Sequence, residues 1–440
     1  MRKTNQSHFS LNDPTLARLL AAEEKRQETT LTLIPSENHP FPGVYQLMGS
    51  RLSDKYAEGY PGQRYYQGQK YIDQIEQYAI DQAKKAFQVP FANVQPLSGS
   101  LANLAVYQAL LPWPPAADDR ADILALSLNA GGHLSHGQKV SLTGRLYRVV
   151  RYPLNQAEII DYQELAQLAR QHRPRLIIAG ITAYPRRLDW AKFAQISDEV
   201  GAYLLADIAH IAGLIVGGAY PSPTPWVDLI TTTTQKTLRG PRGAIIMVTE
   251  KGLKKDPDLG QKINRAVFPG LQGGPSMHTI AAIGYTLAQT QTVQFQRWAQ
   301  QVVKNAQALA QVLTQAGLRL VSGGTESHLL LLDLRPQKLD GKTVAEALET
   351  IGLITNANTI PHDPNPPRRP SGLRLGTPAA TSRGMKEAEM NQIGQWISQV
   401  IRALEKDQFS PNLQKNLRRA VRRLTQRFPL PNNRLKRPTI

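Results

Sequence analysis

Two short apolar segments, each running into a chemically reactive residue, constrain this chain more than any other feature. The first segment is Tyr203–Asp207, and the second begins at Leu229, passes through a run of threonines and reaches Lys236. Continuous apolar runs of this length predict buried strands of a parallel sheet, and ligands bind where such strands end. We therefore expect Asp207 and Lys236 to lie close together at one edge of a sheet.

A lysine beside a carboxylate is what a pyridoxal 5′-phosphate (PLP) site requires. The lysine forms a Schiff base with the cofactor, and the carboxylate keeps the pyridinium nitrogen protonated so that the ring accepts electrons. A single lysine such as Lys236 is more often a solvated side chain. The order in which the turns, the acid and the lysine follow one another favours the PLP interpretation.

Two small-residue turns are candidates for binding the cofactor phosphate. Ser98, Gly99 and Ser100 precede a helix expected at Leu101–Leu111, and Gly273 and Gly274 lie in a second turn. Backbone N–H groups at a helix N-terminus bind anions readily. Each turn alone is weak evidence, because serine commonly caps helices and glycine commonly forms turns.

The alternation of strand and helix patterns predicts an α/β fold with a mostly parallel sheet between helices. Strands are expected at Ile123–Leu126, Leu176–Ile181, Ala202–Ala206, Leu229–Thr232 and Ala244–Val248, and helices at Leu16–Gln27 and Tyr71–Phe87. A long helix from Met277 to about Ala316 should lead into a smaller α+β domain. There we expect short strands at Leu329–Leu332 and Leu373–Leu375 around a helix at Lys342–Ile351, and a proline-rich loop at Pro361–Pro370.

We divide the chain into an N-terminal helical arm (residues 1–35), a large PLP-binding domain (36–290) and a small C-terminal domain (291–440). The 440 residues include no cysteine, which excludes disulfides, iron–sulfur clusters and thiol nucleophiles. No apolar stretch approaches the roughly 18–20 residues that span a bilayer. The first residues lack the apolar core of a secretory signal. We expect a cytoplasmic protein with no membrane partner.

The C-terminal segment is strongly basic. The chain has a formal net charge of +18, and nine lysines or arginines with no acid lie between Pro411 and Ile440. Leu413, Leu417 and Val421 recur at helical spacing, so the segment reads as a terminal helix docked by one face with its arginines outward. A solvated basic face is the favoured interpretation, and nucleic-acid binding is the less favoured alternative.

The chain resembles the serine hydroxymethyltransferases from Leu33 to Leu430. The matching runs are Ile34–Asn38, Lys55–Gly62, Arg64–Tyr66, Gly131–Leu134, Asp207–Gly213, Lys236–Gly243, Ala266–Pro275 and Leu373–Pro378. The resemblance implies the fold type I architecture of PLP-dependent transferases, as a homodimer or dimer of dimers whose active sites are shared between subunits. It also implies PLP as cofactor and tetrahydrofolate as co-substrate.

The same resemblance assigns roles to residues. Lys236 would carry the Schiff base, Asp207 would hold the pyridinium nitrogen, and His133 would stack on the ring. Further cofactor contacts would come from Ser98, Gly99, Ser100, Thr182, His210, Thr233, Gly273 and Gly274. The residues with implied catalytic roles are Lys236, Glu58, His133, His210 and Tyr66. The residues that would contact the amino-acid substrate are Ser36, Tyr56, Glu58, Tyr66, Arg242 and Arg374. The residues that would contact folate are Tyr65, Leu134 and Asn358. No metal site is expected.

Glu58 is the residue expected to move a proton, because a carboxyl among tyrosines suits acid–base chemistry. The implied reaction is reversible transfer of the hydroxymethyl group from L-serine to tetrahydrofolate, giving glycine and 5,10-methylenetetrahydrofolate. The alternative is a folate-independent PLP aldolase or transaldolase acting on threonine-like β-hydroxy amino acids. Gln235, which stands where the family usually has a histidine, favours that alternative, because glutamine cannot exchange a proton.

Overall fold

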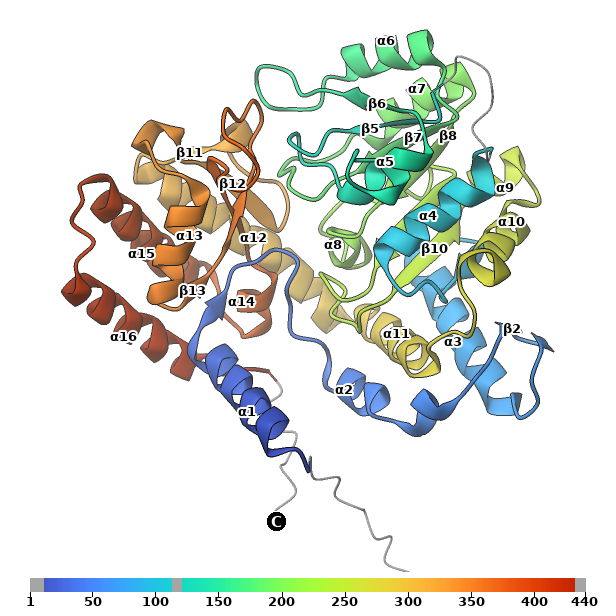
Figure 1. Cartoon of the computed structure of the whole chain (residues 1–440), viewed down its shortest axis with the longest axis horizontal. Coiled ribbons are helices and arrows are strands. Elements are labelled where there is room, and N and C mark those ends of the chain that lie inside the picture. Colours follow the sequence, from blue (N-terminus) through green and yellow to red (C-terminus); the bar gives the residue numbers. More distant parts are fainter. Residues whose placement is uncertain (1–11, 113–120, 432–440) are drawn as a thin grey trace, which may run out of the picture.

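The computed structural model describes residues 12–112 and 121–431. Figure 1 shows a larger part, coloured cyan to yellow, beside a smaller part, coloured orange to red. The two parts each have their own sheet and apolar core. Asp207 and Lys236, the two residues that the sequence singled out, lie where strands of the larger sheet end.

The larger sheet has seven strands in the order β4-β10-β9-β8-β7-β5-β6. The five predicted strands are confirmed with shifts of one residue or less at their ends, as β5 (Ile123–Leu126), β7 (Leu176–Gly180), β8 (Tyr203–Asp207), β9 (Leu229–Thr233) and β10 (Ala244–Val248). The sequence analysis missed β4 (Phe91–Asn93) and β6 (Val149–Tyr152). Both are short edge strands that carry a polar residue, so neither gives a continuous apolar run.

Strand β10 corrects one expectation, because it runs antiparallel to both β9 and β4. The connection from β9 to β10 is a short loop without a helix, and a parallel pairing requires a longer crossover. Strands β5 to β9 are parallel to one another, as predicted. The carboxyl ends of β7, β8 and β9 therefore meet at one edge of the sheet.

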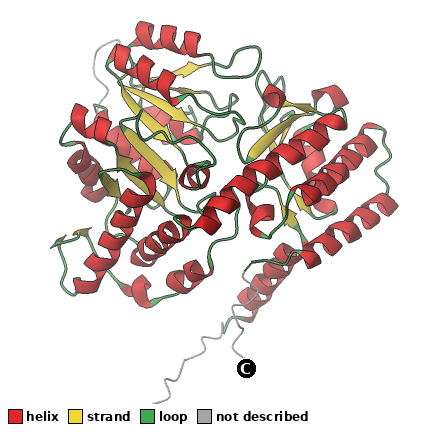
Figure 2. Cartoon of the chain, turned by 180° about the vertical axis from the view of Figure 1, so that it is seen from behind, coloured by secondary structure: helices red, strands yellow, loops and turns green. Residues whose placement is uncertain are grey.

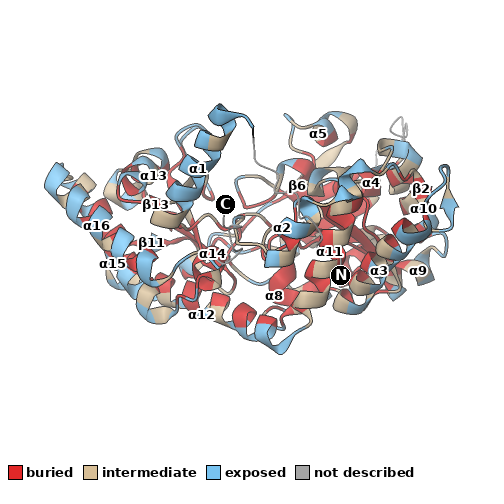
Figure 3. Ribbon diagram, turned by 90° about the horizontal axis from the view of Figure 1, so that it is seen from below, coloured by how far each residue is buried: buried red, intermediate tan, exposed pale blue. Residues whose placement is uncertain are grey.

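Alternate residues of each strand face opposite sides of the sheet, and each side packs on its own helices. Leu204 and Ala206 of β8 join the core formed with α3 (Lys70–Phe87), α7 (Trp190–Val200) and α11 (Met277–Thr290). Leu205 faces the other side, toward α4 (Gly99–Leu110) and α10 (Leu259–Arg265). Figure 3 colours the ribbon by burial and shows many buried segments, in red, within the larger part. Both faces are thus covered, which is why the strands are apolar throughout.

The expected single helix from Met277 to Ala316 is two helices, α11 and α12 (Val293–Gln315). Thr292 lies between them, and its side chain accepts a hydrogen bond from the backbone N–H of Phe295 at 3.3 Å. This N-cap starts a new helix, which the apolar periodicity alone does not reveal. Helix α12 crosses the centre of Figure 2 and packs its first half on the larger core and its second half on the smaller one.

The smaller part contains a sheet of order β11-β12-β15-β14. The predicted strands and helix there are confirmed as β12 (Leu329–Asp333), β15 (Gly372–Gly376) and α13 (Gly341–Thr350), with β12 and β15 antiparallel. The sequence analysis did not predict β11 (Arg319–Leu320), β13 (Leu353–Ile354) or β14 (Asn356–Asn358). The remaining helices here are α14 (Pro378–Ser382) and α15 (Glu387–Glu405). The expected proline-rich segment, residues 361–370, contains no helix or strand.

Two terminal helices pack together against this smaller part. Helix α1 (Pro14–Thr29) begins after Asp13, whose carboxylate accepts from the backbone N–H groups of Thr15 and Leu16, and it contacts α16 (Pro411–Arg427). Figure 1 shows the blue and red helices side by side. In α16 the residues Leu417, Val421 and Leu424 are buried while the arginines between them are exposed, as the sequence predicted. Part of the predicted basic segment, residues 432–440, lies outside the described residues.

Within the described part of the chain, no helix is both long enough and apolar enough to cross a lipid bilayer.

Candidate active site

A cavity of about 330 Å³ lies at the carboxyl ends of β7, β8 and β9. Asp207 and Lys236 both line it, so the structure brings together the pair that the sequence singled out. The other predicted site residues on its wall are Ser36, Ser98, Gly99, Ser100, His133, Thr182, His210, Thr233 and Arg242. These residues come from six separate segments of the chain, which only the fold places together.

Lys236 lies in the loop between β9 and β10 and is partly buried. Its backbone oxygen accepts from the Asn38 side chain at 3.2 Å, and Thr237 anchors the loop through a hydrogen bond from its hydroxyl to the His210 oxygen at 3.0 Å. Burial lowers the pKa of Lys236 to about 8; Asp207 opposes this shift, whereas Arg374 and Arg242 add to it. An amine with this pKa is far more often unprotonated near neutrality than an ordinary lysine, as a nucleophile requires.

Asp207 ends β8 and is buried. Its Oδ2 accepts from His136 Nε2 at 2.9 Å and from Asn103 Nδ2 at 2.8 Å, and its Oδ1 accepts from the backbone N–H of Ala209 at 3.1 Å. Burial acts to raise the pKa of Asp207, but His136 and the other donors outweigh it and hold the pKa well below its ordinary value. Asp207 is therefore ionised at neutral pH and suited to hold a protonated ring nitrogen.

Two histidines on the cavity wall are neutral. Burial lowers the pKa of His133 to about 4. Burial also places the pKa of His210 well below its ordinary value. The His210 ring stacks on His328, with ring centroids 5.5 Å apart and Nδ1 3.3 Å from His328 Nε2. A neutral imidazole such as His133 can stack on an aromatic cofactor without repelling a protonated ring nitrogen.

The phosphate end of the site is the N-terminus of α4. Ser98 caps this helix by accepting from the backbone N–H of Leu101 at 3.3 Å. A Cβ on Gly99 would lie 2.7 Å from Thr233 Cγ2, so glycine lets α4 approach the end of β9. The approach aims helix N–H groups at the cavity, where they favour an anion. An amine, a carboxylate and an anion site in one cavity fit PLP.

Arg374, in β15 of the smaller part, reaches the same edge of the larger sheet. Its Nη1 donates to the Thr182 backbone oxygen at 3.0 Å, and its Nε donates to Asn356 Oδ1 at 3.2 Å. Burial lowers its pKa to about 10, so the guanidinium stays charged at neutral pH. These contacts orient Arg374 as a carboxylate-binding group, which a flexible lysine would not reproduce.

A second group of predicted residues lies elsewhere on the chain. Glu58 Oε2 accepts from the Tyr66 hydroxyl at 3.2 Å, and the Tyr66 ring packs edge-on against Tyr56 at 5.6 Å between centroids. Gly273 and Gly274 lie against this group, since added Cβ atoms would be 3.3 Å from Glu58 Oε1 and 3.0 Å from the Tyr56 ring. None of these five residues lines the Lys236 cavity of the described chain. The structure thus divides the predicted site into two clusters.

The folate residues are divided in the same way. Leu134 follows His133 in the 3₁₀ helix η2 (Leu134–His136) and is half-exposed. Asn358 is in β14, next to the strand that carries Arg374. Tyr65 belongs to the second cluster, packs on Phe268 at 5.8 Å between ring centroids, and is 72% exposed. An aromatic ring this exposed has most of its surface available to another molecule.

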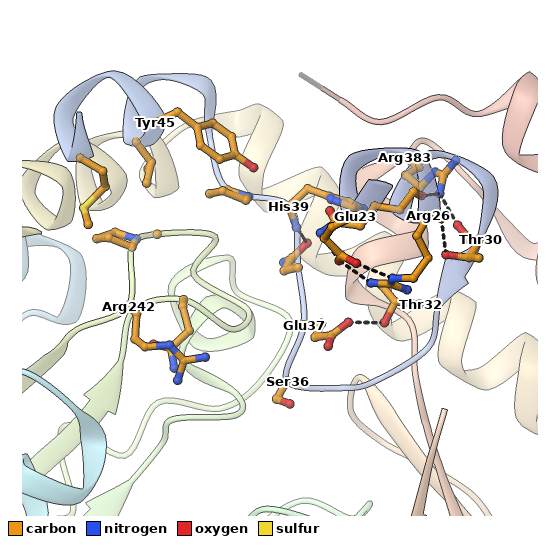
Figure 4. Close-up of a pocket in the computed structure, with 18 residues that line it drawn as sticks. Glu23, Arg26, Thr30, Thr32, Ser36, Glu37, His39, Tyr45, Arg242 and Arg383 are labelled. Carbon is orange, nitrogen blue, oxygen red and sulfur yellow. Dashed lines mark hydrogen bonds and ion pairs between the residues drawn. The ribbon is translucent and has the colours of Figure 1, made fainter. Parts of the chain in front are cut away.

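A second cavity, of about 430 Å³, adjoins the first and shares Ser36, Glu37, Gln235 and Arg242 with it. Figure 4 shows Arg242 on one side and Glu37 on the other, where Glu37 Oε2 accepts from Thr32 Oγ1 at 2.5 Å. Among the described residues, the buried side-chain oxygen of Gln235 has no hydrogen-bond partner. Because Gln235 lines both cavities, it lies at their junction, next to Lys236 in the sequence.

Sequence reasoning missed four residues that hold the site: Asn103, His136, His328 and Asn356. Asn103 is the informative case, because a polar residue on the buried side of a mostly apolar helix needs partners within the protein. His136 follows His133 in the sequence, and this spacing does not predict a contact between His136 and Asp207. His328 comes from the smaller part, and no sequence pattern links it to His210.

The comparisons with known proteins agree with one another. The serine hydroxymethyltransferase family profile matches residues 9–397. A serine hydroxymethyltransferase of Acidothermus cellulolyticus is 49% identical over 426 residues, covering 96% of this chain and 97% of that protein. One of Myxococcus xanthus is 46% identical over 425 residues (96% and 98%), and one of Halorhodospira halophila is 48% identical over 389 residues (88% and 91%).

The lowered pKa of Lys236 predicts a pH dependence. Only the neutral amine reacts with an aldehyde, so covalent modification of the apo protein by PLP should accelerate as pH rises through about 8 and level off above it. Borohydride trapping followed by peptide mass spectrometry measures the rate at this position. Lys236→Arg should lose the modification. A modification rate that still rises tenfold per pH unit above pH 9 would contradict the lowered pKa of Lys236.

The loop that carries Glu58 depends on a buried ion pair. Arg64 donates to Glu76 Oε2 at 2.5 Å and to the backbone oxygens of Ala57 and Gly59, and both charged side chains are almost fully buried. Arg64→Met should lower the free energy of unfolding by about 3–5 kcal/mol, because it leaves a buried charge unpaired. Urea denaturation of the apo protein measures this change.

Arg170→Met is the matched control, because Arg170 pairs with Glu199 on the surface. Exposed pairs contribute about 0–1 kcal/mol, so this variant should unfold almost like the wild type. Equal losses in the two variants would contradict the role of the buried pair.

Proposed function

The chain belongs to the serine hydroxymethyltransferase family, and from this membership we propose which of its residues perform each part of the reaction. The enzyme transfers the hydroxymethyl group of L-serine reversibly to tetrahydrofolate, giving glycine and 5,10-methylenetetrahydrofolate. It is a PLP-dependent transferase with tetrahydrofolate as co-substrate. The observation that carries the assignment of residues is the cavity that places a lysine of lowered pKa beside an ionised, fully hydrogen-bonded aspartate.

Four groups of the Lys236 cavity would hold the cofactor. Lys236 supplies the attaching amine, Asp207 the partner of the ring nitrogen, His133 a neutral stacking face, and the α4 N-terminus at Ser98 and Gly99 the phosphate site. When bound, PLP supplies an aromatic ring that withdraws electrons from the substrate α-carbon. The protein's contribution is to place these groups rigidly before the substrate arrives.

Substrate orientation falls to Arg374 and Ser36. The guanidinium binds the serine carboxylate, while its contacts with Thr182 and Asn356 fix the direction from which it does so. A fixed carboxylate sets the rotation about the bonds to the substrate α-carbon, and thereby selects the bond that breaks.

Proton transfer falls to Glu58. When the Cα–Cβ bond breaks, its electron pair stays with Cα and the hydroxymethyl carbon leaves at the oxidation level of formaldehyde. The serine hydroxyl proton must be removed during this step, and we assign Glu58 as its acceptor. Its hydrogen bond from Tyr66 orients the carboxylate, and the same bond raises the pKa of Tyr66, so the phenol stays protonated as a donor.

The division of the site into two clusters supports a homodimer or a dimer of dimers, in which Glu58 of one subunit serves Lys236 of its partner. The aromatic residues beside Glu58 are exposed in the single chain: Tyr56 is 61% exposed and Tyr66 is 43% exposed. A large aromatic surface beside a chemically reactive group favours burial by another chain. A cytoplasmic location stays a prediction from the sequence.

We propose that the chain consists of an N-terminal arm (residues 1–35), a PLP-binding domain (36–290) and a small domain (291–440). The separate apolar cores of the larger and smaller sheets support this division. Leu31 and Leu33, at the end of the arm, belong to the core of the small domain.

Nucleic-acid binding by the basic face of α16 stays an untested, less favoured alternative. The aldolase alternative has no support from the three relatives described above, each of which is named as a serine hydroxymethyltransferase.

A complementation experiment tests the shared site. Lys236→Gln and Glu58→Gln should each be inactive when prepared alone. When the two variants are unfolded and refolded together, random pairing should restore about a quarter of wild-type activity, because half of the dimers are mixed and one of their two sites is intact. Absence of recovery in a mixture that forms dimers would show that Glu58 serves its own chain.

Glu58→Gln also tests the proton-transfer role by itself. The substitution keeps the size of the side chain but removes the base, so folate-dependent cleavage of serine should slow about 10²–10⁴-fold while PLP stays bound. Steady-state assays together with the cofactor absorbance measure both quantities. Asp54→Asn, an exposed change on the preceding turn, serves as the control and should leave the rate unchanged.

A further inference from the structure

The imidazole of His136 has a tautomer that its surroundings determine. Its Nδ1 accepts a hydrogen bond from the backbone N–H of His133 at 3.3 Å, and its Nε2 lies 2.9 Å from Asp207 Oδ2. A neutral imidazole carries one N–H, and the nitrogen that accepts has none. The hydrogen is therefore on Nε2, and His136 donates it to Asp207 without needing a charge of its own.

Asn103 is oriented by the same carboxylate. An ionised carboxylate only accepts, so the atom of Asn103 that lies 2.8 Å from Asp207 Oδ2 is the amide nitrogen. Its second hydrogen reaches Ser135 Oγ at 2.9 Å, and its oxygen accepts from the Thr231 hydroxyl at 2.7 Å. Both ends of the Asn103 amide are thereby satisfied inside the protein.

The chain of hydrogen bonds continues to the stacking histidine. Because Ser135 Oγ already accepts from Asn103, its own hydrogen is available to His133 Nδ1, 2.7 Å away. The same nitrogen accepts the backbone N–H of Ser135 at 3.1 Å. The hydrogen of His133 is consequently on Nε2. One uninterrupted network therefore joins Asp207, which would face the ring nitrogen of PLP, to His133, which would stack on the ring.

The backbone is built around this network. Gly180 lies opposite Asp207 in the pairing of β7 with β8, and a Cβ there would lie 2.7 Å from His136 Cε1 and 2.8 Å from Asp207 Cβ. Arg151 donates to the His136 backbone oxygen at 2.8 Å and holds that turn in place. His136 itself is 1% exposed. A buried side chain with this little freedom keeps its hydrogen-bond geometry.

We propose that His136 and Asn103 are positioning residues that hold Asp207 ionised and aimed at the ring nitrogen of the cofactor, and that they fix the tautomer of His133. The inference rests on the proposed placement of PLP against Asp207. Neither residue touches substrate or reacting atoms. Each acts through Asp207, so its contribution should vanish when that carboxylate is removed.

A double-mutant cycle tests this dependence. His136→Phe should raise the PLP dissociation constant of the apo protein by about 10- to 100-fold, the effect of losing a hydrogen bond to a charged group. Asn103→Leu should act in the same direction. In an Asp207→Asn background, His136→Phe should change the constant by less than about threefold, because the two residues act as one unit. Absorbance titration with PLP measures all four proteins.

Tyr152→Phe is the control for loss of a buried polar group from the same sheet, since its hydroxyl donates to the Ile178 oxygen and lies outside the site. It should leave the PLP dissociation constant unchanged. An unchanged constant in a folded His136→Phe protein, or an equal effect of that change in the Asp207→Asn background, would overturn the inference. Wild-type affinity and absorbance in Asp207→Asn would instead overturn the proposed cofactor placement itself.

A second measurement is made on the intact wild-type network, and substitutions serve only to assign its signals. Long-range ¹H–¹⁵N correlation spectra of the wild-type holoenzyme labelled with ¹⁵N-histidine report which ring nitrogen carries hydrogen. His133 and His136, assigned by His→Gln variants, should both be Nε2–H tautomers near neutral pH. An Nδ1–H tautomer or a doubly protonated ring at either residue would overturn the proposed network, even if His136→Phe failed to fold.

Discussion

The active site depends on keeping one buried carboxylate ionised. Asp207 ends β8 at a position with little access to water, and burial alone would favour its neutral form. Three donors, from His136, Asn103 and the backbone of Ala209, replace the lost solvation. The ionised carboxylate in turn limits how far burial lowers the pKa of Lys236. The pKa of Lys236 therefore depends on the charge of Asp207, which depends in turn on the donors around that carboxylate.

That arrangement requires close approach between secondary-structure elements. Gly180 leaves room for His136 beside Asp207, and Gly99 lets the start of α4 reach the end of β9. In a close-packed interior a single extra methyl group would push these elements apart. The same parallel register that aligns β7, β8 and β9 also brings their carboxyl ends to one edge. Packing and chemistry are thus set by the same backbone geometry.

The smaller part of the chain supports residues of the cavity wall from behind. Arg374 and His328 both come from its sheet or the loop before it, and each contacts a residue of the larger part, Thr182 and His210 respectively. The cluster around Glu58 is held instead by the buried Arg64–Glu76 pair, away from Lys236. In the proposed homodimer, the two clusters of one chain would belong to two different sites, which a symmetric pair of chains can complete.

The sequence by itself determined the parts that depend on local pattern. The apolar strands, the acid and lysine at their ends, and the docked basic helix follow from periodicity and residue type, and long family motifs named the substrate residues. The direction of β10, the break at Thr292 and the roles of His136, Asn103 and His328 were decided only by the tertiary structure. These features depend on loop length, on a single cap, or on which distant side chains meet. Hydrogen bonds between residues far apart in sequence leave no periodic trace, so only the folded chain shows how Asp207 keeps its charge.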